Sequence, residues 1–298
     1  MEEDVLERRR RVLGENHPDT LTAISGLAGT LYSLGDYESA RRMEEDVLER
    51  RRRVLGENHP DTLTAISGIA STLRSLGDYE SARRMEEDVL ERRRRVLGEN
   101  HPHTLSAISN LASTLRSLGD YESARQMQQD VLERRRRVLG ENHPDTLSAI
   151  SGLAGTLYNL GDYESAQRME GDVLERRRQM LGEDHPDTLT AVSNLAGTLY
   201  SLGDYESARQ MQQDVLDRRR RVIGAGHPDT LVSAVRLAMS RAALNQKLAA
   251  RKIAEEGFQG LRTALGNQHY LTQWARRQLN GIAGSMGGRR QRGNGHRR

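Results

Sequence analysis

The sequence contains no cysteine, so it can form no disulfide bond and offers no thiolate for catalysis or metal binding. Aromatic residues are scarce, at 4% of the 298 residues, which leaves Leu, Ile, Val and Ala to build a core. No apolar run approaches the roughly 20 residues that a membrane-spanning helix needs. The first residues, MEEDVLERRR, are too acidic and polar for a secretory signal. These absences lead us to expect a cytoplasmic protein with no membrane partner.

The chain also has little net charge, only +3 at neutral pH, although charged residues make up 29% of it. Five arginines within the last ten residues supply more than this excess, so the rest of the chain is close to neutral. A body that binds nucleic acid normally gathers positive charge on one face. The charge distribution therefore argues against nucleic acid as a partner.

A segment of 42 residues recurs along the chain. Residues 1–26 and 43–68 are identical, and each copy contains one proline that lies 42 residues from the proline of the next copy. These prolines are Pro18, Pro60, Pro102, Pro144, Pro186 and Pro228. A fixed period over so many copies predicts one elongated array of similar units, each packed against its neighbours.

Each unit has the pattern of two helices joined by a short turn. Pro18 suits the first position of a helix, apolar residues follow at steps of three and four, and Gly35 stops the pattern. This first helix, called A, is expected over residues 18–34. Asp36 is a suitable N-cap for a second helix, called B, over residues 37–55. The short connections make these helices antiparallel, so we expect an all-α fold, an α-solenoid of helix pairs with no sheet.

The unit resembles the tetratricopeptide repeat, with a small residue at Ala28, an aromatic residue at Tyr37 and an alanine at Ala40. The strings LGENHPDTL, ISNLA and LGDYESA are similar to the 42-residue form of kinesin light chains and of the sensor arms of bacterial signal-transducing NTPases. The resemblance covers residues 1–268. It implies a right-handed superhelix whose A helices line a concave groove that binds a protein or peptide.

The two ends differ from the regular units. Residues 1–16 form a leading half-repeat with helix B alone, and residues 17–226 form five full repeats. Because the leading helix does not diverge into a polar cap, we expect a fragment of a longer protein, the alternative being a natural start within a repeat. Residues 227–281 are interpreted as a degenerate repeat and a closing helix, with the only Phe and Trp covering the last apolar face. Residues 282–298 are expected to form a disordered Gly/Arg tail.

Histidines and arginine runs suggest metal or anion sites, but each has a simpler interpretation. Six histidines precede the repeat prolines, yet copies one helix layer apart are separated by about 8–10 Å. That is too far to share a zinc ion, so we expect packing at helix starts and no metal. Runs such as Arg50 to Arg53 end each helix B, where they suit the helix dipole and pair with acids four residues earlier. We expect a solvated, self-paired face.

The second face of helix A is the candidate binding site, because the resemblance places it in the groove. One position varies in size and charge between near-identical repeats, and Tyr and Arg are favoured at protein-binding hot spots. Where light chains have L-N-N-L-A, this chain has Ser for the first Asn and keeps the second in two repeats. The predicted groove residues are Ser25, Tyr32, Ser67, Arg74, Ser109, Asn110, Arg116, Ser151, Tyr158, Ser193, Asn194 and Tyr200. A ligand with an acidic centre would face Arg74 and Arg116; drift at an exposed position is the alternative.

The sequence contains no nucleophile–base–acid set, glycine-rich phosphate loop or metal signature. We therefore expect no enzymatic activity, no cofactor and no small-molecule substrate. The predicted function is a scaffold that binds a peptide or protein segment, as a sensor or adaptor arm. Two alternatives stay open: self-association through the N-terminal helix edge, and an arginine-dependent RNA- or anion-binding solenoid.

Overall fold

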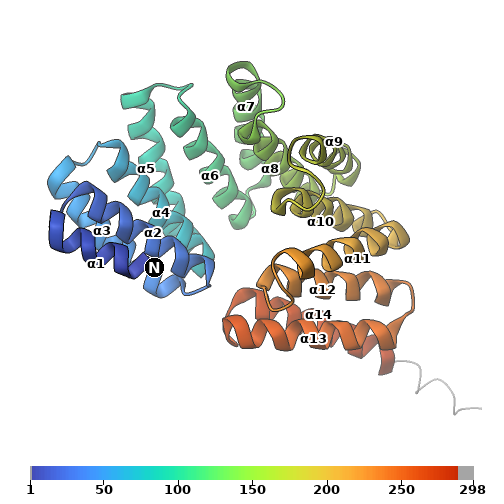
Figure 1. Cartoon of the computed structure of the whole chain (residues 1–298). Helices are drawn as coiled ribbons and strands as arrows, with labels where there is room; N and C mark the ends of the chain where they lie inside the picture. The colour runs from blue at the N-terminus through green and yellow to red at the C-terminus, as the bar shows by residue number, and fades with distance from the viewer. Residues whose placement is uncertain (1, 288–298) are drawn as a thin grey trace, which may run out of the picture. The chain divides into compact units, whose positions relative to one another are not determined.

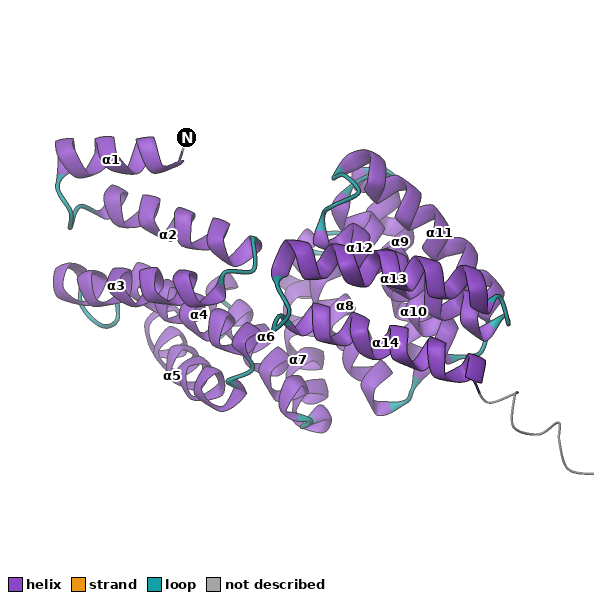
Figure 2. Ribbon diagram, turned by 90° about the horizontal axis from the view of Figure 1, so that it is seen from below, coloured by secondary structure: helices purple, strands orange, loops and turns teal. Residues whose placement is uncertain are grey.

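The computed structural model describes residues 2–287, with side chains for residues 4–284, and over that range it consists of α-helices joined by short turns (Figure 1). Figure 2 shows no strand among these residues, and none of their helices is long and apolar enough to cross a membrane. The expected all-α solenoid of antiparallel helix pairs is confirmed.

The helix boundaries follow the repeat. The A helices are α2 (Pro18–Ser33), α4 (Pro60–Leu76), α6 (Pro102–Leu118), α8 (Pro144–Leu160), α10 (Pro186–Ser201) and α12 (Pro228–Ala243). The B helices are α1 (Glu2–Leu13), α3 (Tyr37–Leu55), α5 (Tyr79–Leu97), α7 (Tyr121–Leu139), α9 (Tyr163–Leu181), α11 (Tyr205–Val222) and α13 (Lys247–Leu265). A closing helix follows as α14 (Tyr270–Gly287).

Side-chain chemistry explains where the helices begin and end. The Nδ1 atom of His59 caps α4 by accepting a hydrogen bond from the Asp61 amide at 3.2 Å. Gly77 ends α4 with φ at 89°, a left-handed conformation that glycine adopts at the lowest cost. Asp78 then caps α5 by accepting a hydrogen bond from the Ser81 amide at 3.1 Å. These local signals recur with the repeat, so the helix ends recur as well.

Within each of the two compact units of the chain, the core lies between each A helix and the B helices that are next to it in the chain. Leu63, Ile66 and Ala70 of α4 are almost completely buried, as are Ala82 and Val89 of α5. Helix α5 contacts both α4 and α6. Burial between neighbouring repeats, more than helix propensity alone, therefore holds the array together.

The described helices form two compact units, Met1–Leu160 with α1 to α8 and Gly161–Arg298 with α9 to α14, called the N-terminal and C-terminal units. In the N-terminal unit, α4 contacts α6 and α6 contacts α8 more extensively than any two of its B helices contact each other. Helices α10 and α12 touch in the same way in the C-terminal unit. Within each unit the A helices thus lie closest together, as on the concave side of a stack.

The C-terminal unit ends in a modified helix pair. Leu261 and Ala275 are buried against Val235, and Phe258 and Trp274 are partly buried beside them. The two large aromatic residues thus pack where the regular pattern stops.

The closing helix continues six residues beyond its predicted end at residue 281, to Gly287. The physical reason is Ile282, which is buried against Ala238, Ala250 and Ala254 and so extends the apolar face of α14. Residues 282–287 are therefore helical and not part of the predicted tail. The remainder of that tail, residues 288–298, lies outside the described residues.

Candidate functional site

The predicted groove residues occupy positions 25, 26 and 32 and their equivalents every 42 residues, which lie on one face of the A helices. Together with positions 29 and 33 on the same face, they are called here the A-helix face. Four of its serines are half-buried and donate their hydroxyl to the carbonyl four residues earlier in the same helix. The Oγ–O distances are 3.0 Å for Ser25, 3.0 Å for Ser67, 3.1 Å for Ser109 and 3.0 Å for Ser151. These hydroxyls are satisfied within their helices, so the serines mainly provide a small, smooth surface.

The equivalent serine of α10, in the C-terminal unit, has different contacts. Ser193 is buried, and Arg236 of α12 donates to its Oγ at 3.0 Å and to its carbonyl oxygen at 3.2 Å. Ser193 therefore lies under a neighbouring side chain and is less accessible than the predicted groove position requires.

The variable position carries tyrosine in three repeats, and these side chains pack on the A-helix face. The hydroxyl groups of Tyr32 and Ser75, on the neighbouring helices α2 and α4, share a hydrogen bond of 2.8 Å. The Tyr32 ring lies 5.0 Å from the ring of Tyr37, and the Tyr200 ring lies 5.2 Å from that of Tyr205. Tyr158 is half-buried. Tyr32 thus connects the adjacent A helices α2 and α4.

Arg74 reaches from α4 to the next A helix. Its Nη1 atom donates to Thr114 Oγ1 at 3.3 Å and to the Asn110 carbonyl oxygen at 3.4 Å. The same atom lies 3.3 Å from Glu86 Oε1, and Glu86 is only 3% exposed. Arg74 therefore already has a buried counter-ion, which weakens its predicted part in binding an acidic ligand.

Glu86 occupies a buried polar position on helix B that the sequence patterns did not single out. Burial raises the pKa of its carboxyl, while the hydrogen bond from Thr114 and the charge of Arg74 act in the opposite direction. The same position holds Glu44, which accepts a hydrogen bond from Thr72 at 2.8 Å, and Gln212, which accepts one from Ser240 at 2.7 Å. The whole set is Glu44, Glu86, Gln128, Glu170 and Gln212. The sequence does contain a signal for this position. Glu44 lies four residues after the buried Ala40 and three before the buried Val47, so it falls on the apolar stripe of helix B.

Arg116 has different surroundings from Arg74. It is half-buried, and a Cβ atom on Gly155 of α8 would collide with its guanidinium, so the side chain lies against the bare backbone there. Among residues 4–284, no carboxylate forms an ion pair with Arg116 and no group accepts a hydrogen bond from it. Burial lowers the pKa of the Arg116 guanidinium, and the nearby charge of Arg74 lowers it further.

The residue after the repeat serine is Gly in some repeats and Asn in others, and two of the glycines lie under helix B side chains. A Cβ on Gly68 would lie 3.1 Å from Glu44 Oε1, and one on Gly152 would lie 3.4 Å from Gln128 Nε2. The helix B side chains therefore lie close over these glycines. Asn110 and Asn194 are half-buried at the equivalent positions, and their predicted role in binding stays a prediction.

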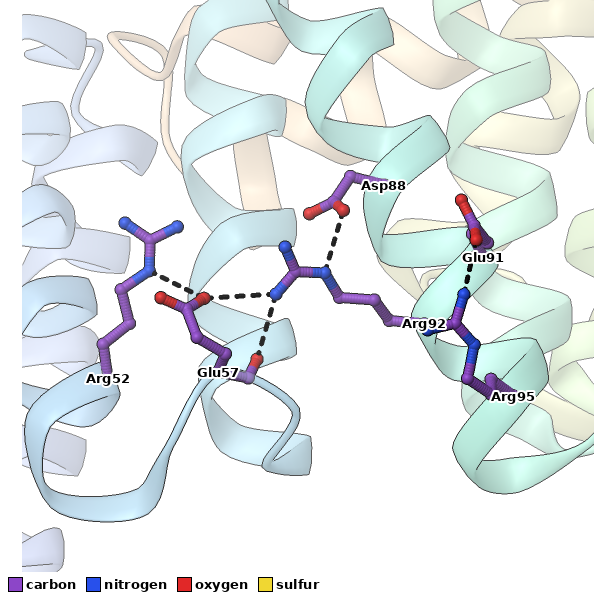
Figure 3. Close-up of polar contacts among 6 residues, drawn as sticks. All are labelled: Arg52, Glu57, Asp88, Glu91, Arg92 and Arg95. Carbon is purple, nitrogen blue, oxygen red and sulfur yellow. Dashed lines mark hydrogen bonds and ion pairs between the residues drawn. The ribbon is translucent and has the colours of Figure 1, made fainter.

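The arginine runs divide between buried and exposed side chains. Arg92 donates to Asp88 at 2.8 Å and to Glu57 of the preceding loop at 3.1 Å, and Glu57 also accepts from Arg52 (Figure 3). Arg95 pairs with Glu91. A hollow of about 380 Å³ is lined by these groups, Arg52 excepted, and by Asn58. Here the expected self-paired face is confirmed, and its opposite charges leave little net attraction for an anion.

For the second arginine of each run, the expectation of a solvated side chain is wrong. Arg93 is 4% exposed and donates to the His103 carbonyl oxygen at 3.0 Å and to Thr64 Oγ1 at 3.4 Å. Its buried equivalents are Arg51, Arg135, Arg177 and Arg219. The guanidinium is long enough to cross between helices and has five donors to satisfy, so it joins helix B to the start of the next A helix.

The repeat histidines lie at helix starts. All six accept a hydrogen bond through Nδ1 from the backbone amide two residues later; they are His17, His59, His101, His143, His185 and His227. His101 and His103 stack with ring centroids 5.3 Å apart. No group of three or more potential ligands that could hold a metal ion occurs in the part of the chain that the structure describes.

The repeat of this chain matches a known protein family. Two profiles described as tetratricopeptide repeat cover most of the chain. One matches residues 87–137 and 103–179, and the other matches residues 1–19, 20–61, 62–103 and 188–229. No curated protein matches the chain in a sequence comparison.

Several solved structures are similar in fold. A Podosopora anserina protein with nearly identical TPR-like repeats, assigned as a kinesin light chain, is 22% identical with a TM-score of 0.54, covering 69% of this chain and 97% of that one. A Rap protein complexed with competence and sporulation factor is 12% identical with a TM-score of 0.66, covering 95% and 80%. A signal-transduction ATPase from Pyrococcus horikoshii with a tetratricopeptide repeat sensor is 16% identical with a TM-score of 0.57, covering 90% and 39%.

Proposed function

Because the chain belongs to the tetratricopeptide repeat family, we propose that it is a protein-interaction scaffold that binds a peptide or protein segment along the A-helix face. One observation carries the proposal: within each unit successive A helices touch, α4 with α6, α6 with α8 and α10 with α12, and they present small residues interrupted by one large position that changes between repeats. A face of this kind gives an extended segment a smooth path and a few distinctive contacts.

The similar structures support the proposal by analogy. The Rap protein was solved in complex with competence and sporulation factor, and the Pyrococcus horikoshii protein uses its repeats as a sensor. A sensor or adaptor arm is therefore the role we propose for this array. The partner would be a protein or peptide.

A second candidate function is self-association through α1. Val5 is 43% exposed, whereas its equivalent in the next repeat, Val47, is 1% exposed. Val12 is 78% exposed on the same helix. An apolar edge of this kind favours packing against another helix, including one from a second copy.

The absence of cysteine makes a single cysteine a unique attachment point for a photo-cross-linker. We would label Ser33→Cys or Ser117→Cys on the A-helix face, with Arg137→Cys, exposed on α7, as the matched control. A partner identified from lysate and then purified should cross-link strongly from the first two positions and at least about tenfold less from the third. Unlabelled protein should compete.

Equal cross-linking from Arg137→Cys would show that the A-helix face is not the binding surface. The label is also placed at Val12→Cys. Cross-linking from this position to a second copy of the chain, with no partner captured from the A-helix face, would favour self-association instead.

A further inference from the structure

Two arginines of the N-terminal unit occupy equivalent positions but have different counter-groups. Arg74 lies 3.3 Å from Glu86, twelve residues later in the chain. Arg116 is the equivalent residue in the next repeat, and the residue twelve positions later is Gln128. The repeats therefore carry the same cation with a carboxylate in one case and a neutral amide in the other.

This difference leaves Arg116 without charge compensation. No carboxylate of residues 4–284 pairs with it, and the positive charge of Arg74 acts on it unfavourably. Gln128 is 4% exposed, and its Oε1 atom has no hydrogen-bond partner among the described residues. A half-buried guanidinium is stabilised when an anion supplies the missing charge and accepts its hydrogen bonds.

The geometry favours a carboxylate as that anion. A guanidinium can donate two parallel hydrogen bonds to one carboxylate, which gives direction as well as attraction. The A-helix face presents one uncompensated charge in this unit, whereas RNA or another polyanion requires a row of them. The Ser and Gly residues around Arg116 are neutral, so this part of the A-helix face offers no charged partner to the rest of the bound segment.

We propose that the scaffold recognises one carboxylate of its bound segment at Arg116, and that the residue at position 128 decides which repeat has this preference. The inference rests on the proposed function, because the carboxylate is carried by the segment bound along the A-helix face. Arg74 positions α6 and does not bind an anion of the ligand, because Glu86 already neutralises its charge.

The test uses synthetic random peptide libraries against the wild-type chain, Gln128→Glu, Glu86→Gln and Arg116→Gln. One library has internal Asp and Glu with an amidated C-terminus, and a second has neither residue but a free C-terminal carboxylate. The wild type should enrich acidic residues at one position of the first library if a side chain is recognised, or prefer the second if the chain end is. Gln128→Glu and Arg116→Gln should lose that preference.

Glu86→Gln should gain a second acidic position. The two repeats are about 10 Å apart, which corresponds to about three residues of extended peptide. A gain of this kind cannot result from misfolding, so it complements the two loss variants. All variants are compared only at unchanged helicity.

One selected peptide then serves in a double-mutant cycle. Its affinity should fall about tenfold with Gln128→Glu, the effect of losing one charge-assisted hydrogen bond. Replacing the acidic group of the peptide with an amide should lower its affinity for the wild type by the same factor. The amide peptide should then bind the wild type and Gln128→Glu equally. Peptides that bind with no acidic preference, or equally to Gln128→Glu, would overturn the inference and leave the scaffold function standing. If no peptide binds the wild type, the proposed function fails and the inference fails with it.

Discussion

At the scale of single residues, position within a run of identical side chains decides the role of an arginine. Arg92 and Arg95 form ion pairs at the surface, whereas Arg93 between them is buried and donates to the next A helix. Exposed ion pairs contribute little to stability because water and salt screen them. A buried donor that satisfies a carbonyl costs more to remove, since the carbonyl loses its partner.

This contrast gives a prediction with its control in the same helix. Arg93→Ala should lower the free energy of unfolding by about 1–3 kcal/mol, because the His103 carbonyl and Thr64 hydroxyl lose a donor. Arg95→Ala, at a side chain that is 71% exposed, should change it by less than about 0.5 kcal/mol. Urea unfolding followed by circular dichroism measures both. Equal effects would contradict the assigned difference.

At the scale of helices, the last pair departs from the repeat by close approach. Gly257 of α13 replaces the valine that is buried in α3, α5, α7, α9 and α11, and α13 makes the most extensive contact of any helix pair with α12. A Cβ on Gly257 would lie 2.7 Å from Val235 Cγ2 and 3.1 Å from the Leu231 carbonyl oxygen. The backbone atom cannot rotate away, so only a glycine allows this spacing.

Gly257→Ala should therefore destabilise the C-terminal unit by about 1–3 kcal/mol, the usual cost of overpacking. Gly171→Ala in α9 is the matched control, because a Cβ there meets nothing within 4 Å, and it should stabilise by about 0.5–1 kcal/mol through helix propensity. The fluorescence of Trp274, the only tryptophan, reports unfolding of this unit. A neutral or stabilising Gly257→Ala would show that α13 is free to shift.

At the scale of the whole molecule, two sets of carboxyl groups act on stability in opposite directions. Burial raises the pKa of Glu44, Glu86 and Glu170. Hydrogen bonds from Ser39 and Ser81 lower the pKa of the capping Asp36 and Asp78. A raised pKa means that the folded state binds the proton more tightly, so the buried glutamates destabilise the fold once ionised. A lowered pKa means that the caps stabilise the fold only while ionised.

The urea midpoint should therefore rise as the pH falls from 7 toward about 5, pass a maximum, and fall below about pH 4. Glu44→Gln should flatten the rise, because Gln already occupies the equivalent positions 128 and 212. Asp78→Asn should reduce the fall on the acid side, since Asn caps a helix without titrating. The measurement is a series of urea titrations at fixed ionic strength. A midpoint that is highest at pH 7 would contradict this balance.

Local patterns predicted the helices because their signals lie within a few residues of each other. Proline at the helix start, Asp at the cap and glycine at the end act within one or two turns, and steps of three and four identify the buried face. The repeat period, the helix bounds and the fold class were therefore readable from the sequence. Arg93 was wrongly expected to be solvated because the arginines of each run look alike in sequence, and Glu86 was missed because it lies among other acids of helix B.

The partners of those side chains were decided by tertiary structure. Tyr32 meets Ser75, Arg74 meets Thr114, and Glu44 meets Thr72, all across helix contacts between repeats. Which residues meet depends on how far each helix is rotated about its axis and how closely it approaches its neighbour. The sequence by itself determined the period, the helices and the chemistry available on each face. Only the packing of α4 against α5 decided that Glu86 neutralises Arg74, because a counter-ion acts through distance in space, whatever its separation along the chain. The neutral Gln128 at the equivalent position leaves Arg116 without such a partner.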